Sequence, residues 1–235
     1  MPKNEPTARN STEIDPTRSD LDNFLADMMA TKKSDVAASG RLIFALDATM
    51  SREETWDMAC QLQGDMFKTV ASIGGLNVQL VYYRGLDECR ASRWVTDPVK
   101  LANMMTKIRC NAGHTQIGKV LTHAKRETGL LKVAAVVFVG DAFEEEADEV
   151  VPLAQQLGHL NVPVFMFQEG KASTVERVFR EIAKASHGAY CRFDDGSADQ
   201  LRELLKLVAT FAVGGKAALE ASKSADAVKL LSQLK

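Results

Sequence analysis

The chain has 235 residues, of which 46% are hydrophobic and 26% are charged, and its formal net charge is -2. This length suits one α/β domain with terminal segments, or two small domains. The near-zero charge provides no positive field for binding nucleic acid or an anionic membrane. No apolar run approaches the roughly 20 residues that cross a bilayer, and the first residues lack the apolar core of a secretory signal.

Four cysteines are scattered along the chain without a CxxC pair, at Cys60, Cys89, Cys110 and Cys191. Isolated cysteines of this kind indicate reduced thiols rather than a disulfide framework or a closed zinc site. We therefore expect a cytoplasmic protein without membrane attachment.

The first 39 residues differ in character from those that follow. Residues 1–18 are polar and aperiodic, which predicts a mobile segment. After Ser19, apolar residues recur at helical spacing and predict a short amphipathic helix: Leu21, Phe24, Leu25, Met28 and Met29. Residues 1–39 are thus expected to form a flexible tail that carries one short helix, which docks on the domain or on a partner.

From residue 40 to residue 213, short apolar runs alternate with longer helical periods. The apolar runs predict strands at 41–47, 76–84, 132–141, 161–168 and 188–194, and the short polar stretch CRASRWV predicts an edge strand at 89–95. The helical periods predict helices at 53–73, from Asp97 onward, and at 114–127, 144–158, 174–186 and 198–213. Gly214 and Gly215 end the last of these, and residues 214–235 are predicted to form a C-terminal helical extension.

This alternation predicts an α/β fold with a doubly wound, mostly parallel six-stranded sheet and helices on both faces. The connection between the second and third strands, GLDE at 85–88, is too short for a crossover, so the third strand should be antiparallel. A strand order of 3-2-1-4-5-6 accommodates both features. The topology then switches direction between the first and fourth strands, where open α/β sheets bind ligands.

Polar side chains gather at that predicted switch point. The first strand ends in Asp47, and two hydroxyls follow on alternate residues, Thr49 and Ser51. The fourth strand ends in Asp141, and the helix that precedes this strand begins near Thr115. Two carboxylates and three hydroxyls are hard oxygen donors, which suit Mg²⁺, Mn²⁺ or Ca²⁺.

Helix capping is the alternative explanation for each of these residues taken alone. Ser51 with Glu54 matches a capping box, Asp141 with Glu144 resembles one, and Thr115 stands at a predicted helix start. Capping does not explain why all five polar positions fall at one switch point. We therefore predict a metal site formed by Asp47, Thr49, Ser51, Thr115 and Asp141.

These five residues match a known pattern in order and position. Residues 40–213 resemble a von Willebrand factor A (VWA) domain, a Rossmann-like fold whose metal-ion-dependent adhesion site (MIDAS) reads Asp-x-Ser-x-Ser, then Thr, then Asp. Here the motif appears as Asp47-Ala-Thr49-Met-Ser51, Thr115 and Asp141. Thr49 departs from the usual serine but keeps the hydroxyl. The flanking segments are similar to those of stand-alone bacterial VWA proteins.

The resemblance implies a function that is not enzymatic. Ser51 and Thr49 would bind Mg²⁺ or Mn²⁺ directly, Thr115 directly or through water, and Asp47 and Asp141 mostly through water. A Glu or Asp of a partner protein would complete the coordination. Relatives of this kind often work beside AAA+ ATPases or in larger assemblies, so such a partner is expected.

The residues beside the motif allow two interpretations each. His114 adjoins Thr115 and either contacts a partner at the rim of the site or is an ordinary loop histidine. The acidic residues after Asp141 are expected to form a solvated first helical turn that complements the helix dipole: Glu144, Glu145, Glu146, Asp148 and Glu149.

Two rival functions remain open at this point. Haloacid dehalogenase-type phosphatases also place an aspartate nucleophile after the first strand, as Asp47 would be, but their second aspartate corresponds to Thr49 here. A structural scaffold with an unoccupied site is the other alternative. DATMSREE contains no glycine, which excludes a glycine-rich nucleotide-binding turn.

Overall fold

The computed structural model describes residues 40–52, 76–193 and 198–234, all within one compact unit, Lys33–Lys235. The helices predicted after Ser19 and at 53–73 lie outside the described residues, as does Cys60. No helix of the described part is long and apolar enough to cross a membrane.

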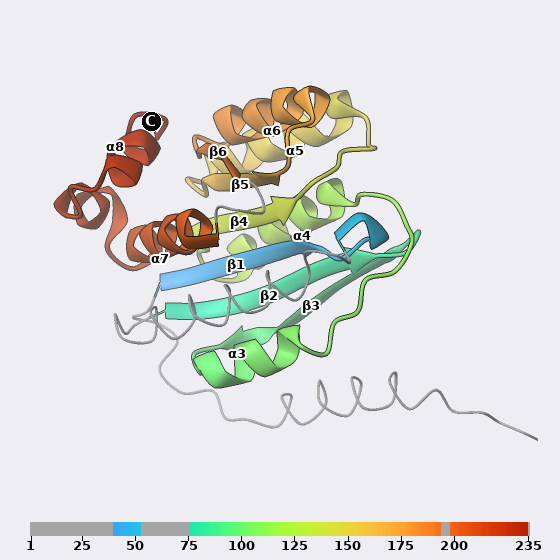
Figure 1. The fold of residues 1–235 in the computed structure, drawn as a ribbon. Helices are drawn as coiled ribbons and strands as arrows, with labels where there is room; N and C mark the ends of the chain where they lie inside the picture. The colour runs from blue at the N-terminus through green and yellow to red at the C-terminus, as the bar shows by residue number, and fades with distance from the viewer. Residues whose placement is uncertain (1–39, 53–75, 194–197, 235) are drawn as a thin grey trace, which may run out of the picture. The chain divides into compact units, whose positions relative to one another are not determined.

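A six-stranded sheet forms the centre of the unit, in the order β3-β2-β1-β4-β5-β6 (Figure 1). Every neighbouring pair is parallel except β2 and β3, which are antiparallel. This confirms the predicted fold class, strand order and antiparallel third strand. The strands are β1 Gly40–Asp47, β2 Leu76–Arg84, β3 Glu88–Val95, β4 Ala135–Gly140, β5 Val164–Glu169 and β6 Tyr190–Phe193.

In the part of the chain that the structure describes, helices lie between consecutive strands from β3 onward and follow the last strand. They are α3 Pro98–Met105, α4 Ile117–Leu130, α5 Ala147–His159, α6 Ser173–Ala185, α7 Ala198–Ala221 and α8 Ala225–Leu231, with a 3₁₀ turn, η2, at Met50–Arg52. Asp97 caps α3 by accepting from the N–H groups of Val99 and Lys100. Helix α7 is interrupted at Gly215, whose φ of 67° suits glycine, and Ser224 caps α8 after it.

The two faces of β1 are buried against different helices. Ile43 and Ala45 belong to one core with α4, α5 and α6, while α7 packs against the sheet at β1. Alternate residues of a strand point to opposite faces, so the side chain of Asp47 follows Ile43 and Ala45 toward the first of these cores. An apolar strand buried on both faces therefore ends in a carboxylate that is buried too.

The C-terminal segment packs against the end of the sheet. Leu230 and Leu234 are buried, and the side chain of Gln233 hydrogen-bonds the backbone of Tyr190 on β6. Residues 214–221 continue α7 and residues 225–231 form α8, so the predicted extension is helical in two pieces.

Candidate metal-binding site

Asp47 is fixed at the carboxyl end of β1 by hydrogen bonds to both oxygens of its carboxylate. Its Oδ1 accepts the backbone N–H of Thr49 at 2.8 Å, and its Oδ2 accepts the hydroxyl of Tyr83 at 2.9 Å. The parallel register pairs Asp47 with Tyr83 on β2, which puts the two side chains next to each other. The side chain is 0% exposed, so the carboxylate is a rigid part of the core.

The hydroxyls of Thr49 and Ser51 lie together beyond Asp47. Their oxygens are 3.1 Å apart, and Ser51 is exposed while Thr49 is buried. The Asp47–Thr49 hydrogen bond folds the chain back, and the N–H of Arg52 then donates to the carbonyl of Thr49 at 3.1 Å. The turn thus presents two neighbouring oxygens from alternate residues.

A buried ion pair anchors the far end of the same turn. Arg52 is 1% exposed, and its Nη1 lies 2.9 Å from Oε2 of Glu169 at the end of β5. The turn that carries Ser51 is therefore held by β1 and β2 on one side and by β5 on the other. This contact could not be predicted from the sequence, because no local pattern links residues so far apart along the chain.

Asp141 follows β4 and comes close to Asp47. Gly140 allows this approach, because a Cβ added there would lie 3.3 Å from the Cβ of Asp47 and 2.8 Å from the ring of Phe138. Oδ1 of Asp141 is buried and has no hydrogen-bond partner among the described residues. A buried carboxylate oxygen without a donor is rare, and an ion or water is the usual partner of such a group.

The pKa of Asp47 reflects its burial and its neighbours. Burial raises the pKa of Asp47 above its ordinary value, the hydrogen bonds from Thr49 and Tyr83 oppose this rise, and the negative charge of Asp141 adds to it. Burial and the nearby carboxylate of Asp47 likewise keep the pKa of Tyr83 well above its usual range. A cation placed beside Asp47 would favour the ionised form of its carboxylate.

Thr115 is bound to the loop that follows Asp141. Its Oγ1 accepts the N–H of Glu144 at 2.8 Å, and its own N–H donates to Oε2 of Glu144 at 3.1 Å. Within the described residues no hydrogen bond joins Thr115 to Asp47, Thr49 or Ser51. The structure thus brings the motif residues after β1 into direct contact, places Asp141 near Asp47, and ties Thr115 to the loop after Asp141.

Glu145, rather than Thr115, satisfies the start of α4. Its carboxylate accepts the N–H groups of Ile117 and Gly118, whereas Gln116 at the N-cap makes no side-chain cap bond. Asp148 and Glu149 lie in the first turn of α5, as expected for acidic residues near a helix dipole. Glu144 and Glu145 precede that turn and instead hold the loop between Thr115 and α4.

His114 lies next to this loop and is 67% exposed, with Nδ1 3.3 Å from Oε2 of Glu144. Its contact with a partner stays a prediction.

The donor set fits a hard divalent cation of the Mg²⁺ type. No group of three or more His, Cys, Asp or Glu side chains in the described ranges could hold a metal by itself. The five motif positions provide two carboxylates, and the remaining donors are hydroxyls of Thr49, Ser51 and Thr115. Such a site suits Mg²⁺ or Mn²⁺, which accept oxygen ligands and retain some of their water.

Comparison with solved structures identifies VWA domains as structural neighbours. The von Willebrand factor type A protein from Catenulispora acidiphila aligns with a TM-score of 0.60 and 16% identity, over 74% of this chain and 43% of that one. The SpRpn10 VWA domain aligns with a TM-score of 0.55 and 11% identity, over 66% and 88% of the two chains. The pilus adhesin SpaC from Lactobacillus rhamnosus GG gives 0.60 and 9%, over 77% and 31%.

The chain therefore has the fold of a VWA domain. It spans less than half of the Catenulispora protein and of SpaC, but most of the SpRpn10 domain. No family model matches the sequence, and no curated protein matches it either. Structural similarity at sequence identities of 16% and below shows the fold alone, so the function is inferred from the site.

Proposed function

We propose that the protein is a protein-interaction module that binds Mg²⁺ or Mn²⁺ through Asp47, Thr49, Ser51, Thr115 and Asp141, and that this ion recognises an acidic residue of a partner protein. Two observations carry the proposal: the hydroxyls of Thr49 and Ser51 lie 3.1 Å apart after the buried Asp47, and Asp141, directly after the neighbouring strand β4, has a buried oxygen without a hydrogen-bond partner among the described residues. Ca²⁺ is a third candidate, because it also takes oxygen ligands.

The donor types explain why the partner would be acidic. Neutral hydroxyls lower the charge of a divalent cation less than carboxylates do, so the bound ion keeps a positive field for an outside Glu or Asp. Asp47 is held by two hydrogen bonds and cannot turn toward a ligand without losing them. Thr49 and Ser51 are the residues best placed for direct contact with the ion.

The structural neighbours support an interaction module over an enzyme. They include the pilus adhesin SpaC from Lactobacillus rhamnosus GG and a pilus tip protein from Porphyromonas gingivalis. An AAA+ ATPase or a larger assembly in the cytoplasm is the kind of partner we propose, with no role for nucleic acid or membrane. The near-zero net charge agrees with a partner that is neither nucleic acid nor an anionic membrane.

A phosphatase that uses Asp47 as nucleophile is less well supported. A nucleophilic carboxylate needs an exposed oxygen, whereas Asp47 is 0% exposed and both its oxygens accept hydrogen bonds. Thr49 occupies the position where such enzymes carry their acid–base aspartate. The remaining alternative is a structural scaffold, and metal binding separates it from the proposal.

Isothermal titration of the purified protein with MgCl₂ and MnCl₂, together with thermal unfolding in metal or EDTA, tests the metal site. At a metal concentration 100 times the Kd, binding to the folded state adds about 2.7 kcal/mol to the free energy of unfolding. EDTA should reverse the gain. Absence of heat and of any stabilisation at millimolar metal would leave only the scaffold.

Partner recognition is tested separately, on the metal-loaded protein. Partners captured from cell lysate should be released by EDTA, and should not be captured by the Ser51→Ala variant in metal. Capture that is equal with and without EDTA would place the interface elsewhere on the molecule.

A further inference from the structure

Strand β6 is the last strand of the sheet, and its outer edge is only partly covered. Ala189 and Phe193 accept hydrogen bonds from Met166 and Gly170, on the β5 side. Tyr190 bonds in the opposite direction: its N–H donates to Oε1 of Gln233 at 2.9 Å, and its carbonyl accepts from Nε2 of Gln233 at 3.2 Å. One glutamine amide thus takes the place of a neighbouring strand at Tyr190.

The next outward-facing residue of the same edge, Arg192, lacks such a cover. Backbone groups alternate between the two sides of a strand, so the N–H and C=O of Arg192 point the same way as those of Tyr190. Among the described residues nothing hydrogen-bonds to either group. An open strand edge of this kind is a template for pairing with another extended chain.

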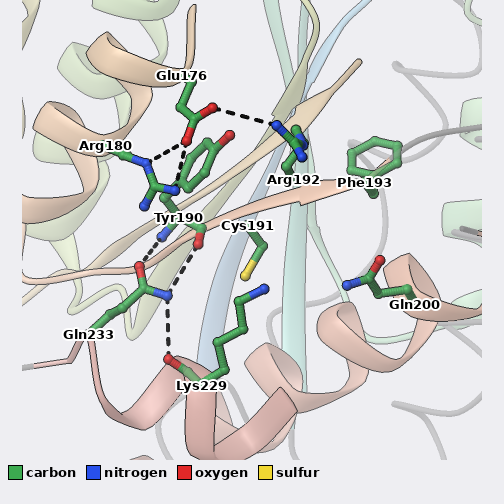
Figure 2. A pocket seen from close by; sticks show the side chains of 9 residues that line it. All are labelled: Glu176, Arg180, Tyr190, Cys191, Arg192, Phe193, Gln200, Lys229 and Gln233. Carbon is green, nitrogen blue, oxygen red and sulfur yellow. Dashed lines mark hydrogen bonds and ion pairs between the residues drawn. The ribbon is translucent and has the colours of Figure 1, made fainter. Parts of the chain in front are cut away.

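A cavity of about 380 Å³ lies along this edge (Figure 2). Helix α6 lines it through Glu176 and Arg180, β6 through Tyr190 and Arg192, and the C-terminal segment through Lys229 and Gln233. Figure 2 shows Lys229 reaching toward Cys191 on β6 from one side and Arg180 lying over Tyr190 on the other. The cavity therefore straddles the edge of the strand.

The charge lining this cavity is positive. Arg180, Arg192 and Lys229 face a single lining carboxylate, Glu176, which pairs with Arg180 at 2.8 Å and with Arg192 at 3.6 Å. No carboxylate of the described residues forms an ion pair with Lys229, although Asp226 on the same helix lies near Cys191. The stacking of Arg180 on Tyr190, 4.3 Å from the ring centroid, holds that guanidinium in place.

We propose that the β6 edge is a second docking site, at which an extended acidic segment of a partner protein adds as a short strand beside Arg192. Its backbone pairs with the free N–H and C=O, and its carboxylates meet Arg180, Arg192 and Lys229. This mode of recognition combines main-chain pairing, which gives affinity, with side-chain charge, which gives specificity. The site shares no residue with the metal site and works without a divalent ion.

Fluorescence anisotropy with a labelled peptide that alternates Val with Glu tests this proposal, in EDTA and with the full chain. The Glu peptide should bind, and the peptide that alternates Val with Gln should bind at least about tenfold more weakly. Only alternate N–H groups of the peptide would face β6. N-methylation of those amides should abolish binding, and N-methylation of the amides between them should leave binding intact. Equal effects of the two methylation patterns would overturn the strand-addition model.

Charge reversal on the protein provides the matched comparison. Arg192→Glu and Lys229→Glu should each weaken the Glu peptide about tenfold or more. Arg177→Glu, on the same helix α6 but paired with Glu181 and outside the cavity, should change the affinity less than twofold. Equal losses in all three variants would mean non-specific attraction and would refute the proposal. Circular dichroism and the unfolding temperature of each variant show whether it is folded.

Discussion

Tyr83 stabilises the motif through its hydroxyl as well as through the packing of its ring in a buried strand. Its hydroxyl donates to the buried Asp47, so Tyr83→Phe leaves a carboxylate oxygen without a donor and should lower the free energy of unfolding by about 1–3 kcal/mol. Urea unfolding at neutral pH measures the change.

Tyr82→Phe is the matched control, one residue away in the same strand. The hydroxyl of Tyr82 makes no hydrogen bond with the described residues, and its pKa is raised chiefly by burial, with a smaller contribution from Glu88. Its removal should change the free energy of unfolding by less than about 0.5 kcal/mol. Equal costs for Tyr82→Phe and Tyr83→Phe would mean that the bond to Asp47 contributes nothing of its own.

Ser51 separates a role in metal binding from a role in folding. Its side chain is exposed, and its hydroxyl contacts Thr49 at 3.1 Å, so Ser51→Ala should cost no more than about 1 kcal/mol without metal. The same substitution should abolish the rise in unfolding temperature with MgCl₂ or MnCl₂. Ser173→Ala, an exposed serine at the start of α6, should leave the response to metal intact. A full metal response in Ser51→Ala would remove Ser51 from the site.

The residues of the motif were predictable, but their supports were not. The alternation of Asp47, Thr49 and Ser51 is visible in the sequence because the turn after a strand is a local structure. The bond from Tyr83 depends on the register of β1 against β2, and the Arg52–Glu169 pair depends on where β5 ends relative to the turn after β1, with β4 between the two strands. Neither register nor the distance between strand ends is encoded in a short window.

At the scale of the elements, the loops around the site explain where the helices begin. The sequence predicted helices from 114 and 144, whereas α4 begins at Ile117 and α5 at Ala147. Thr115 and Glu144 hydrogen-bond each other, and the carboxylate of Glu145 accepts the N–H of Gly118 in α4. Both helices therefore begin three residues after their predicted starts. Strand β2 was predicted at its observed bounds, Leu76–Arg84.

Glu145 is expected to act as the missing cap of α4. Glu145→Ala removes the acceptor for the N–H groups of Ile117 and Gly118 and should lower the free energy of unfolding by about 1–2 kcal/mol. Urea unfolding is again the measurement. Glu146→Ala is the control, because Glu146 is adjacent and exposed and makes no side-chain cap bond. If Glu146→Ala cost as much, the effect would come from acidic charge in general.

The strands also shield two thiols. Burial raises the pKa of Cys89 on β3 and of Cys191 on β6 from 9.0 to about 11. At pH 8 this lowers the thiolate fraction about hundredfold, so iodoacetamide should label both cysteines far more slowly in the folded protein than in guanidinium. Labelling should rise about tenfold per unit between pH 8 and pH 10. Peptide mass spectrometry measures each site, and equal rates in folded and unfolded protein would contradict the burial.

At the scale of the whole molecule, one short hairpin and the order of apolar runs were enough to predict the sheet. The connection at residues 85–88 is too short for a crossover, so β3 runs against β2, and the helices α5 and α6 allow β4, β5 and β6 to run parallel. The packing of the C-terminal segment on β6 could not be predicted, because residues 216–235 show only a mild helical period. Their place depends on the break at Gly215 and on the polar contact of Gln233.

The contact of Gln233 with Tyr190 has a consequence for self-association. A sheet that ends in an open strand tends to pair with the same strand of another molecule. Here the side-chain amide of Gln233 occupies the backbone groups of Tyr190 and so blocks such pairing at that residue. A chain that ends at Val213 loses this amide together with the buried Leu230 and Leu234. We expect light scattering to show dimers and larger aggregates of the shortened chain at concentrations where the full chain shows none. A monodisperse shortened chain would show that the C-terminal segment does not prevent self-association through β6.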